Sequence, residues 1–319
     1  MNGIYRVYED GKLIREVKNK LTLLGRSNAI SAMLGLTQSF GSSLGIGISS
    51  ASNGTDKFLN KTDLDYNVGK YPVNSSSLGQ DSSQTKDALV YTARITDPSR
   101  YTIYELGLFS GQISGSVDFE GISVLNFESG DSLKETVSGT TYYLDDTYES
   151  RKATYATDNV NYRIGSNCVK LDTGGTIFVN DTNYNLSNFF PLDLLKLAFY
   201  ASGQTNITVK FYNGDNYATF VFNSGSGVVA NSYNVVSLLQ SQATVTGTMD
   251  WASVNKIELS VANGTYALLD GLRIDRTKPE DSIDGLVSRA VLDGSTKIEK
   301  QAGSIIDIEY LMIFDLDAG

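Results

Sequence analysis

The chain has 319 residues, a formal net charge of −10, no histidine and a single cysteine, Cys168. Without histidine, Ser-His-Asp and Cys-His catalytic arrangements and His-ligated zinc are excluded. One cysteine permits no internal disulfide, and we expect Cys168 to be a small buried strand residue. Because the negative charge repels phosphate backbones and anionic lipid surfaces, we expect neither nucleic acid nor membrane as a partner.

The composition is typical of an all-β protein with many turns, because 30 Gly, 19 Tyr and 13 Phe accompany only 19% charged residues. The length exceeds that of a usual single domain, so we expect two domains. At the start of the chain, two strand-like runs flank Asp10-Gly11, which predicts a β-hairpin over residues 4–17.

One short helix is predicted over residues 24–36, where apolar residues recur at helical spacing. Ser27 or Asn28 would cap it and Gly35 would end it. Residues 49–88 are rich in Ser, Asn, Gly and Asp with little periodicity, which predicts a long surface excursion. Further strands of the same domain are predicted at residues 44–48, 88–95, 101–109, 285–292 and 304–314.

The middle of the chain, from Gly121 to Asp275, has the pattern of a separate β module inserted into this domain. Its strand-like runs cover residues 153–157, 168–171, 176–179, 194–201, 206–212, 218–222, 234–239, 256–261 and 268–274. Such a set, without a helical stretch, predicts a two-sheet sandwich of jelly-roll type. We therefore expect a split β-sandwich-like anchor domain, residues 1–118 with 279–319, and an inserted jelly-roll domain, residues 119–278.

Short motifs in the outer pieces carry a resemblance to a known family. They are Asn19-Lys20-Leu21-Thr22, Leu44-Gly45-Ile46-Gly47-Ile48, the segment from Tyr101 to Phe109 that contains Glu105-Leu106-Gly107, and late runs around Ser288-Arg289, Lys297-Ile298-Glu299-Lys300 and Ile308-Glu309-Tyr310. In these motifs the outer pieces resemble tail-fibre, baseplate and related appendage proteins of tailed bacteriophages. The resemblance implies a structural protein located in the virion, a homo-oligomer that contacts other virion proteins. It implies no catalysis.

Two ends of the insert carry a second resemblance. Phe127-Glu128 near its start, and Asp250-Trp251 and Leu269-Asp270-Gly271 near its end, resemble conserved ends of jelly-roll carbohydrate-binding modules. In many such modules an early glutamate and a late aspartate hold a structural calcium ion, which by position implies Glu128 and Asp270 here. Two carboxylates with backbone carbonyls suit calcium. The alternative is that both are solvated or hydrogen-bonded carboxylates at a sheet edge.

Sugar binding requires aromatic faces with amides or carboxylates nearby. Of the loop tyrosines of the insert, Tyr184, Tyr212 and Tyr217 lie beside Asn183, Asn185, Asn213 and Asn216, so these three are the candidate ligand-binding residues. Trp251 directly precedes a strand, and we expect it to cap the core rather than to bind sugar.

Three classes of function follow. We expect a structural virion protein whose insert projects as a spacer or decoration, with binding of host-surface glycans by the insert as a subordinate hypothesis. The alternative is a non-enzymatic glycan-binding adhesin of the bacterial surface, against which we count an N-terminus that runs directly into a strand pattern without a signal peptide. An enzyme is not expected: a glycan depolymerase needs two carboxylates, but Asp145-Asp146, if on a strand, would face opposite ways, and Asp172 has no partner at a suitable spacing.

Overall fold

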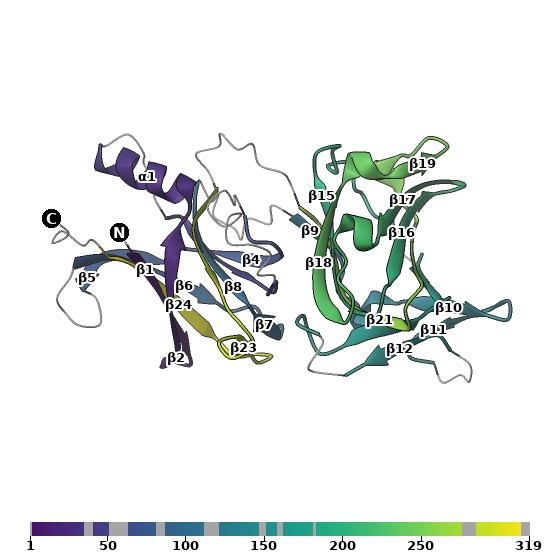
Figure 1. The fold of residues 1–319 in the computed structure, drawn as a ribbon, viewed down its shortest axis with the longest axis horizontal. Coiled ribbons are helices and arrows are strands. Elements are labelled where there is room, and N and C mark those ends of the chain that lie inside the picture. Colours follow the sequence, from purple (N-terminus) through teal and green to yellow (C-terminus); the bar gives the residue numbers. More distant parts are fainter. Residues whose placement is uncertain are drawn as a thin grey trace. The chain divides into compact units, whose positions relative to one another are not determined.

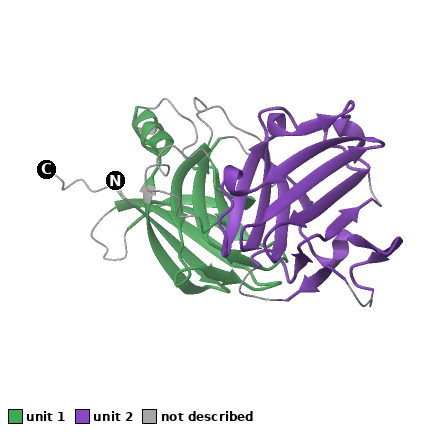
Figure 2. Cartoon of the chain, turned by 45° about the vertical axis from the view of Figure 1, so that its right-hand side comes forward, with its two compact units in different colours: residues 1–119, 278–319 green, residues 120–277 purple. Residues whose placement is uncertain are grey.

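The computed structural model describes residues 2–34, 41–50, 63–80, 87–111, 121–146, 151–157, 162–180, 183–275 and 285–313. The chain forms two compact units, Met1–Phe119 with Lys278–Gly319, and Glu120–Thr277 (Figure 2). In the described part, strands dominate and α1 is the one α-helix, which confirms the all-β fold class. No helix in these residues is long and apolar enough to cross a membrane.

The outer unit is built on one antiparallel sheet of nine strands, in the order β4-β3-β8-β22-β2-β1-β24-β6-β5 (Figure 1). β3 and β4 also contact β6, which lies near the opposite end of this order, so the sheet folds over itself in a sandwich-like way. A separate ladder joins β7 and β23. The strands of this unit are β1 (Asn2–Glu9), β2 (Lys12–Leu21), β3 (Ser43–Gly47), β4 (Asn67–Pro72), β5 (Ser75–Gln80), β6 (Asp87–Ile95), β7 (Tyr101–Ile103), β8 (Glu105–Ser110), β22 (Gly285–Val291), β23 (Ile298–Lys300) and β24 (Ile306–Ile313).

The expected surface excursion is only partly irregular. Residues 51–62 and 81–86 lie outside the described residues, but 67–72 and 75–80 form β4 and β5, two strands that the low periodicity of this segment did not predict. β5 pairs with β6 and is an exposed edge strand. Apolar alternation is not needed for such a strand, because its partner supplies the backbone hydrogen bonds.

The helix α1 (Leu23–Met33) begins earlier than expected. Its first turn is capped by Thr22, whose hydroxyl accepts a hydrogen bond from the N–H of Gly25 at 2.9 Å, so the expected cap at Ser27 or Asn28 was wrong. Gly25 lies so close to β22 that an added Cβ would be 1.9 Å from the carbonyl oxygen of Val287. The helix therefore packs on β22 only because this residue has no side chain. Gly35 lies outside the described residues.

The insert is a sandwich of two antiparallel sheets that confirms the expected jelly-roll domain. One sheet has the order β11-β10-β14-β20-β16-β17-β19, and the other β12-β13-β21-β15-β18 with β9 added to β21. Their strands are β9 (Gly121–Leu125), β10 (Lys134–Val137), β11 (Thr140–Tyr143), β12 (Ala153–Ala156), β13 (Cys168–Asp172), β14 (Thr176–Val179), β15 (Leu194–Ser202), β16 (Asn206–Asn213), β17 (Asn216–Phe222), β18 (Ser232–Leu239), β19 (Thr244–Thr246), β20 (Lys256–Ala262) and β21 (Tyr266–Asp275). Short 3-10 turns lie at η2 (Ser129–Asp131), η3 (Ser224–Ser226), η4 (Gln240–Gln242) and η5 (Trp251–Ser253).

A single apolar core fills the space between the two sheets of the insert, with side chains such as Phe211, Phe220 and Leu269 fully or almost fully buried. Trp251 packs at its margin, with its ring 4.9 Å from that of Phe189, as expected for a residue that caps the core. Cys168 is a buried free thiol, also as expected.

A buried ion pair joins the two separated pieces of the outer unit. Arg289 on β22 donates from Nε to the carboxylate of Glu105 on β8 at 3.0 Å, and from Nη2 to Asp65 at 2.8 Å. Glu105 is fully buried and Arg289 is 3% exposed. Loss of one partner would leave the other charge buried without compensation, which is costly.

We expect Arg289→Met to destabilise the outer unit by about 3–5 kcal/mol, because Glu105 would stay buried alone. Denaturant unfolding followed by circular dichroism should show the loss, whereas fluorescence of Trp251, the one tryptophan of the chain and a residue of the insert, should report an unchanged transition. Arg94→Met is the matched control, because Arg94 pairs with Asp307 at the surface with 55% of its side chain exposed. Equal losses in the two variants would contradict the structural role of the buried pair.

Candidate functional site

Strand alternation gives the seven-stranded sheet of the insert two unlike faces. On β20, Ile257 and Leu259 point into the core, so Lys256 and Glu258 point away from it. The neighbouring strands follow the same rule and place Phe178, Lys210, Tyr212 and Tyr217 on the same side as Lys256 and Glu258. We call these six residues of β14, β20, β16 and β17 the outer face.

The register of the ladders aligns the outer face in two rows across the strands. Phe178 lies opposite Glu258, which lies opposite Lys210. In the adjacent row, Lys256 lies opposite Tyr212, which lies opposite Tyr217. Directly opposed side chains on one face of a sheet are in contact range, so residues from four strands form one continuous surface.

The ammonium group of Lys256 joins aromatic rings and a carboxylate. Its Nζ lies 4.8 Å from the ring centroids of both Phe178 and Tyr212 and 2.5 Å from the Glu258 carboxylate. The Tyr212 hydroxyl donates to the other oxygen of Glu258 at 3.1 Å. Burial, followed by the charge of Glu258, raises the pKa of Tyr212 to about 12, so its hydroxyl remains a neutral donor.

Tyr212 and Tyr217 form a ring pair on neighbouring strands, with centroids 5.3 Å apart and planes tilted by 45°. Lys210 places its ammonium 5.0 Å from the Tyr217 centroid. Lys210, Tyr212 and Tyr217 are all half-buried, so the rings stay accessible at one side. Aromatic faces beside an amine and a carboxylate can stack on the C–H face of a sugar and hydrogen-bond its hydroxyls.

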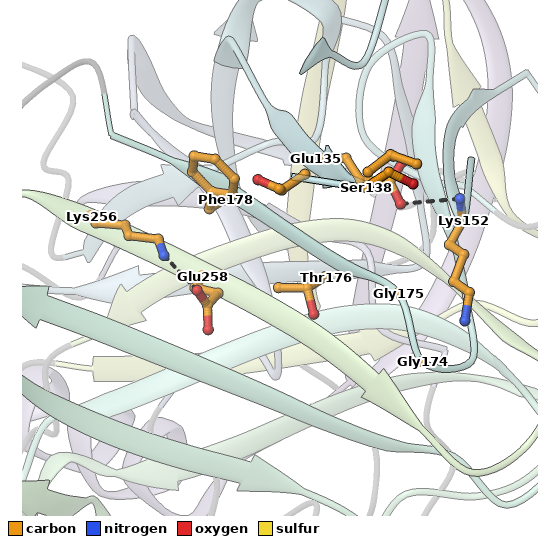
Figure 3. Close-up of a pocket in the computed structure, with 11 residues that line it drawn as sticks. Glu135, Ser138, Lys152, Gly174, Gly175, Thr176, Phe178, Lys256 and Glu258 are labelled. Carbon is orange, nitrogen blue, oxygen red and sulfur yellow. Dashed lines mark hydrogen bonds and ion pairs between the residues drawn. The ribbon is translucent and has the colours of Figure 1, made fainter. Parts of the chain in front are cut away.

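A cavity of about 380 Å³ opens beside the outer face and shares three of its residues, Phe178, Lys256 and Glu258. Figure 3 shows Lys256 directed to Glu258 at one side of the cavity and Glu135 at another. Glu135 is buried, and its carboxylate accepts hydrogen bonds from the backbone N–H groups of Lys152 at 3.1 Å and Ala153 at 3.3 Å. Its oxygens are therefore engaged in holding the chain before β12.

Two of the three candidate tyrosines come together at this site. Tyr212 and Tyr217 are directly opposed on the outer face, whereas Tyr184 forms a backbone bridge with Val254 and packs against the core. The asparagines that suggested these positions act on loops: Asn213 donates to the Ser253 carbonyl and Asn216 accepts from Thr248. The sequence reasoning missed Phe178, Lys210, Lys256 and Glu258, which alternation along β14, β16 and β20 could have placed on one side.

Glu128 and Asp270, the expected calcium ligands, both hold one loop. Glu128 accepts from the N–H groups of Ser166 at 2.7 Å and Asn167 at 3.1 Å. Asp270 is fully buried at a bulge of β21, and it accepts from the N–H groups of Arg163 and Ile164 and from the Tyr233 hydroxyl.

This set of donors does not fit a shared calcium ion. Calcium requires several oxygen ligands, but the groups around both carboxylates direct hydrogen atoms at them. In the part of the chain that the structure describes, no group of three or more His, Cys, Asp or Glu side chains is placed to hold a metal. The contacts support the alternative of hydrogen-bonded carboxylates. The calcium expectation stays a prediction, which a rise in the melting temperature on adding calcium after chelation would support.

The carboxylates considered for catalysis are not arranged as a pair. Asp145 and Asp146 lie in the turn after β11 rather than on a strand, so the argument from strand alternation does not apply to them. Asp146 accepts from the N–H of Tyr143 at 2.9 Å and so closes this turn. Asp172 ends β13 and pairs with Lys170 at 3.3 Å.

No protein-family model matches this chain, and no curated protein matches its sequence. Among solved structures, it is similar to a family 11 carbohydrate-binding module from Clostridium thermocellum in complex with a β-1,3-1,4-mixed-linked tetrasaccharide, with 9% identity and a TM-score of 0.33 over 49% of this chain and 95% of that one. It is also similar to a family 30 carbohydrate-binding module of a cellulosomal cellulase of Clostridium thermocellum, with 13% identity and a TM-score of 0.29. That match covers 60% of this chain and 99% of the module. A third similar structure is a carbohydrate-binding module from Cellvibrio mixtus lichenase 5A in complex with cellotriose, with 16% identity and a TM-score of 0.26. That match covers 49% of this chain and 100% of the module. These TM-scores are too low to support a function.

Asp270 predicts a pH dependence for the insert. Burial, opposed by the hydrogen bond from Tyr233 and those from Arg163 and Ile164, raises its pKa from 3.8 to about 7. Between these two pKa values the folded state keeps a proton that the unfolded state has released. The contribution of Asp270 to the stability of the insert is therefore largest below pH about 4 and is lost as pH rises to about 7. The melting temperature, followed by Trp251 fluorescence, should fall over that window relative to Asp270→Asn. Parallel curves for the two proteins would contradict the shift.

Proposed function

We propose that the insert binds glycans on its outer face. The observation that carries this proposal is the opposed pair of Tyr212 and Tyr217, flanked by Lys210 and by the Lys256–Glu258 ion pair. The surface offers apolar ring area and polar groups side by side, which is the combination that sugars require. The sequence resemblance of the insert to carbohydrate-binding modules supports the same conclusion.

Binding without hydrolysis accounts best for the carboxylates near this surface. Glycoside hydrolysis uses two carboxyl groups that are available to the scissile bond. Here Glu258 is engaged by Lys256 and Tyr212, and Glu135 by two backbone N–H groups. We therefore propose a non-enzymatic module.

Tyr212→Ala and Tyr217→Ala should each weaken glycan binding about tenfold, because each removes one ring of the stacking surface. Affinity electrophoresis of the full chain against a panel of neutral and acidic polysaccharides measures the effect. Tyr266→Ala is the matched control: Tyr266 pairs with Tyr200 at 6.4 Å, but both tyrosines lie on the other sheet. Loss of binding in the control, or none in the outer-face variants, would remove the proposed site.

For the outer unit, we propose the role that its sequence motifs suggest, which is to anchor the protein in a virion appendage. The motif around Glu105-Leu106-Gly107 forms β8, which lies between β3 and β22 in the sheet. A specific feature favours assembly: β5 is an edge strand. Along one of its sides the backbone N–H and C=O groups pair with no strand that the structure describes, and Leu78 on β5 is 84% exposed. Exposed edges of this kind pair readily with another chain.

Leu78→Lys should therefore reduce the mass of the particle that the pure chain forms, because a lysine on an edge strand opposes pairing. Light scattering measures the mass, with circular dichroism to show an unchanged fold. Val245→Lys is the control, since Val245 is 49% exposed on β19, an edge strand of the insert. A monomeric wild-type chain, or the same change in the control, would contradict an assembly role for β5.

A further inference from the structure

The charges of the insert's seven-stranded sheet are distributed unevenly for a chain of net charge −10. Only four charged side chains occupy positions on its strands that point away from the core, and three of them are lysines: Lys134, Lys210, Lys256 and Glu258. Each of the three ammonium groups lies over an aromatic ring, at 4.9 Å from the centroid of Tyr143 for Lys134 and at 4.8–5.0 Å for the other two. The surface is therefore both aromatic and cationic.

The one carboxylate among the four is already neutralised. Glu258 accepts from the Lys256 ammonium at 2.5 Å and from the Tyr212 hydroxyl at 3.1 Å. Lys256 is consequently committed to an ion pair, and Lys134 donates to Asn180 at 3.0 Å. Lys210 differs, because among the described residues it makes no ion pair or hydrogen bond, and its ammonium lies over the Tyr217 ring.

Lys210 also occupies the middle of the surface. It lies opposite Glu258 on β20 and opposite Thr219 on β17, and its ammonium is held over Tyr217 of the ring pair. A ligand stacked on this pair would meet an uncompensated positive charge at its edge. The hydroxyls of a neutral sugar could accept hydrogen bonds from this ammonium, but only an anionic group would also compensate its charge.

Resting on the proposed function, we propose that the outer face is specific for acidic glycans, whose carboxylate or sulfate group is bound by Lys210 while the sugar ring stacks on Tyr212 and Tyr217. A lysine ammonium is a compact positive charge with three hydrogen-bond donors, so it can bind either a carboxylate or a sulfate. The overall charge of −10 repels polyanions, so a polyanion that binds must do so at a local site such as this one.

The test measures binding of the full chain to polygalacturonate, to dextran sulfate and to a neutral mixed-linked β-glucan, with single-stranded oligothymidylate as a further polyanion. We expect tighter binding to one or both acidic polysaccharides than to the neutral glucan, and weakening as ionic strength rises. Lys210→Met should lower the affinity for the acidic polymer about fivefold, as for a partly exposed ion pair, and should lower any affinity for the neutral glucan by less than that. The two acidic probes show whether carboxylate or sulfate is the anion bound.

Lys170→Met is the matched control, because Lys170 also lies 5.0 Å over a tyrosine, Tyr266, but on the other sheet and paired with Asp172. Equal affinity for acidic and neutral glycans, or an unchanged affinity in Lys210→Met, would overturn acidic specificity. If neutral glucan alone binds and Tyr217→Ala abolishes it, the proposed glycan function stands and the specificity falls. Binding to no polysaccharide would overturn both, and oligothymidylate bound more tightly than the glycans would assign the face to nucleic acid instead.

Discussion

Two antiparallel strand pairs close the insertion, and the rest of the structure depends on them. In the outer unit, Ser110 at the end of β8 pairs with Gly285 at the start of β22, so the sheet continues across the point where the chain leaves and returns. In the insert, Gly121 at the start of β9 pairs with Asp275 at the end of β21. Each unit thereby brings its own two chain ends together. A module closed in this way can be carried by another domain without interrupting that domain's hydrogen-bonded ladder.

Register within the insert follows from its core and in turn determines the outer face. The side-chain period of a strand is two, so a slip of one residue would move every core side chain to the solvent side. Burial of Ile257, Leu259 and Phe211 therefore fixes where Lys256, Glu258 and Tyr212 must lie. The outer face therefore requires little free energy of its own, because its residues occupy the strand positions that alternate with the core positions.

Strong alternation made most of the fold predictable. The runs over residues 206–212 and 256–261 became β16 and β20 almost unchanged, because their apolar residues alternate clearly, and the run over 268–274 became β21. β10, β11 and β5 were not predicted, since their sequences are polar and they form on partners that sequence periodicity does not reveal. The helix was found but its start was not, because the hydroxyl of Thr22 lies directly after a strand rather than within the periodic run.

The site was only half predictable for a related reason. Tyr212 and Tyr217 flank one turn, so local sequence was enough to bring them together. Phe178 and Lys256 join them through a strand order in which β14 pairs with β20 and β20 with β16, and such long-range pairing is not encoded in any local pattern. Tyr184 was chosen on the same local criterion as the other two, but its strand-like bridge to Val254 turns it toward the core.

The two sheets of the insert carry similar residue types on the sides away from the core, but they differ in how their charged side chains are paired. The six-stranded sheet also carries tyrosines and basic residues on the side away from the core, yet there Asp275 holds both Lys196, at 2.7 Å, and Arg273, and Lys170 is paired with Asp172. Burial by itself would raise the pKa of Asp275, but the charges of Lys196 and Arg273 together outweigh burial and lower this pKa, so these paired charges have little to offer a ligand. On the seven-stranded sheet the same residue types leave Lys210 over an aromatic ring and without an ion pair to any residue that the structure describes. This difference in charge pairing is the observation on which the proposal of acidic-glycan binding rests.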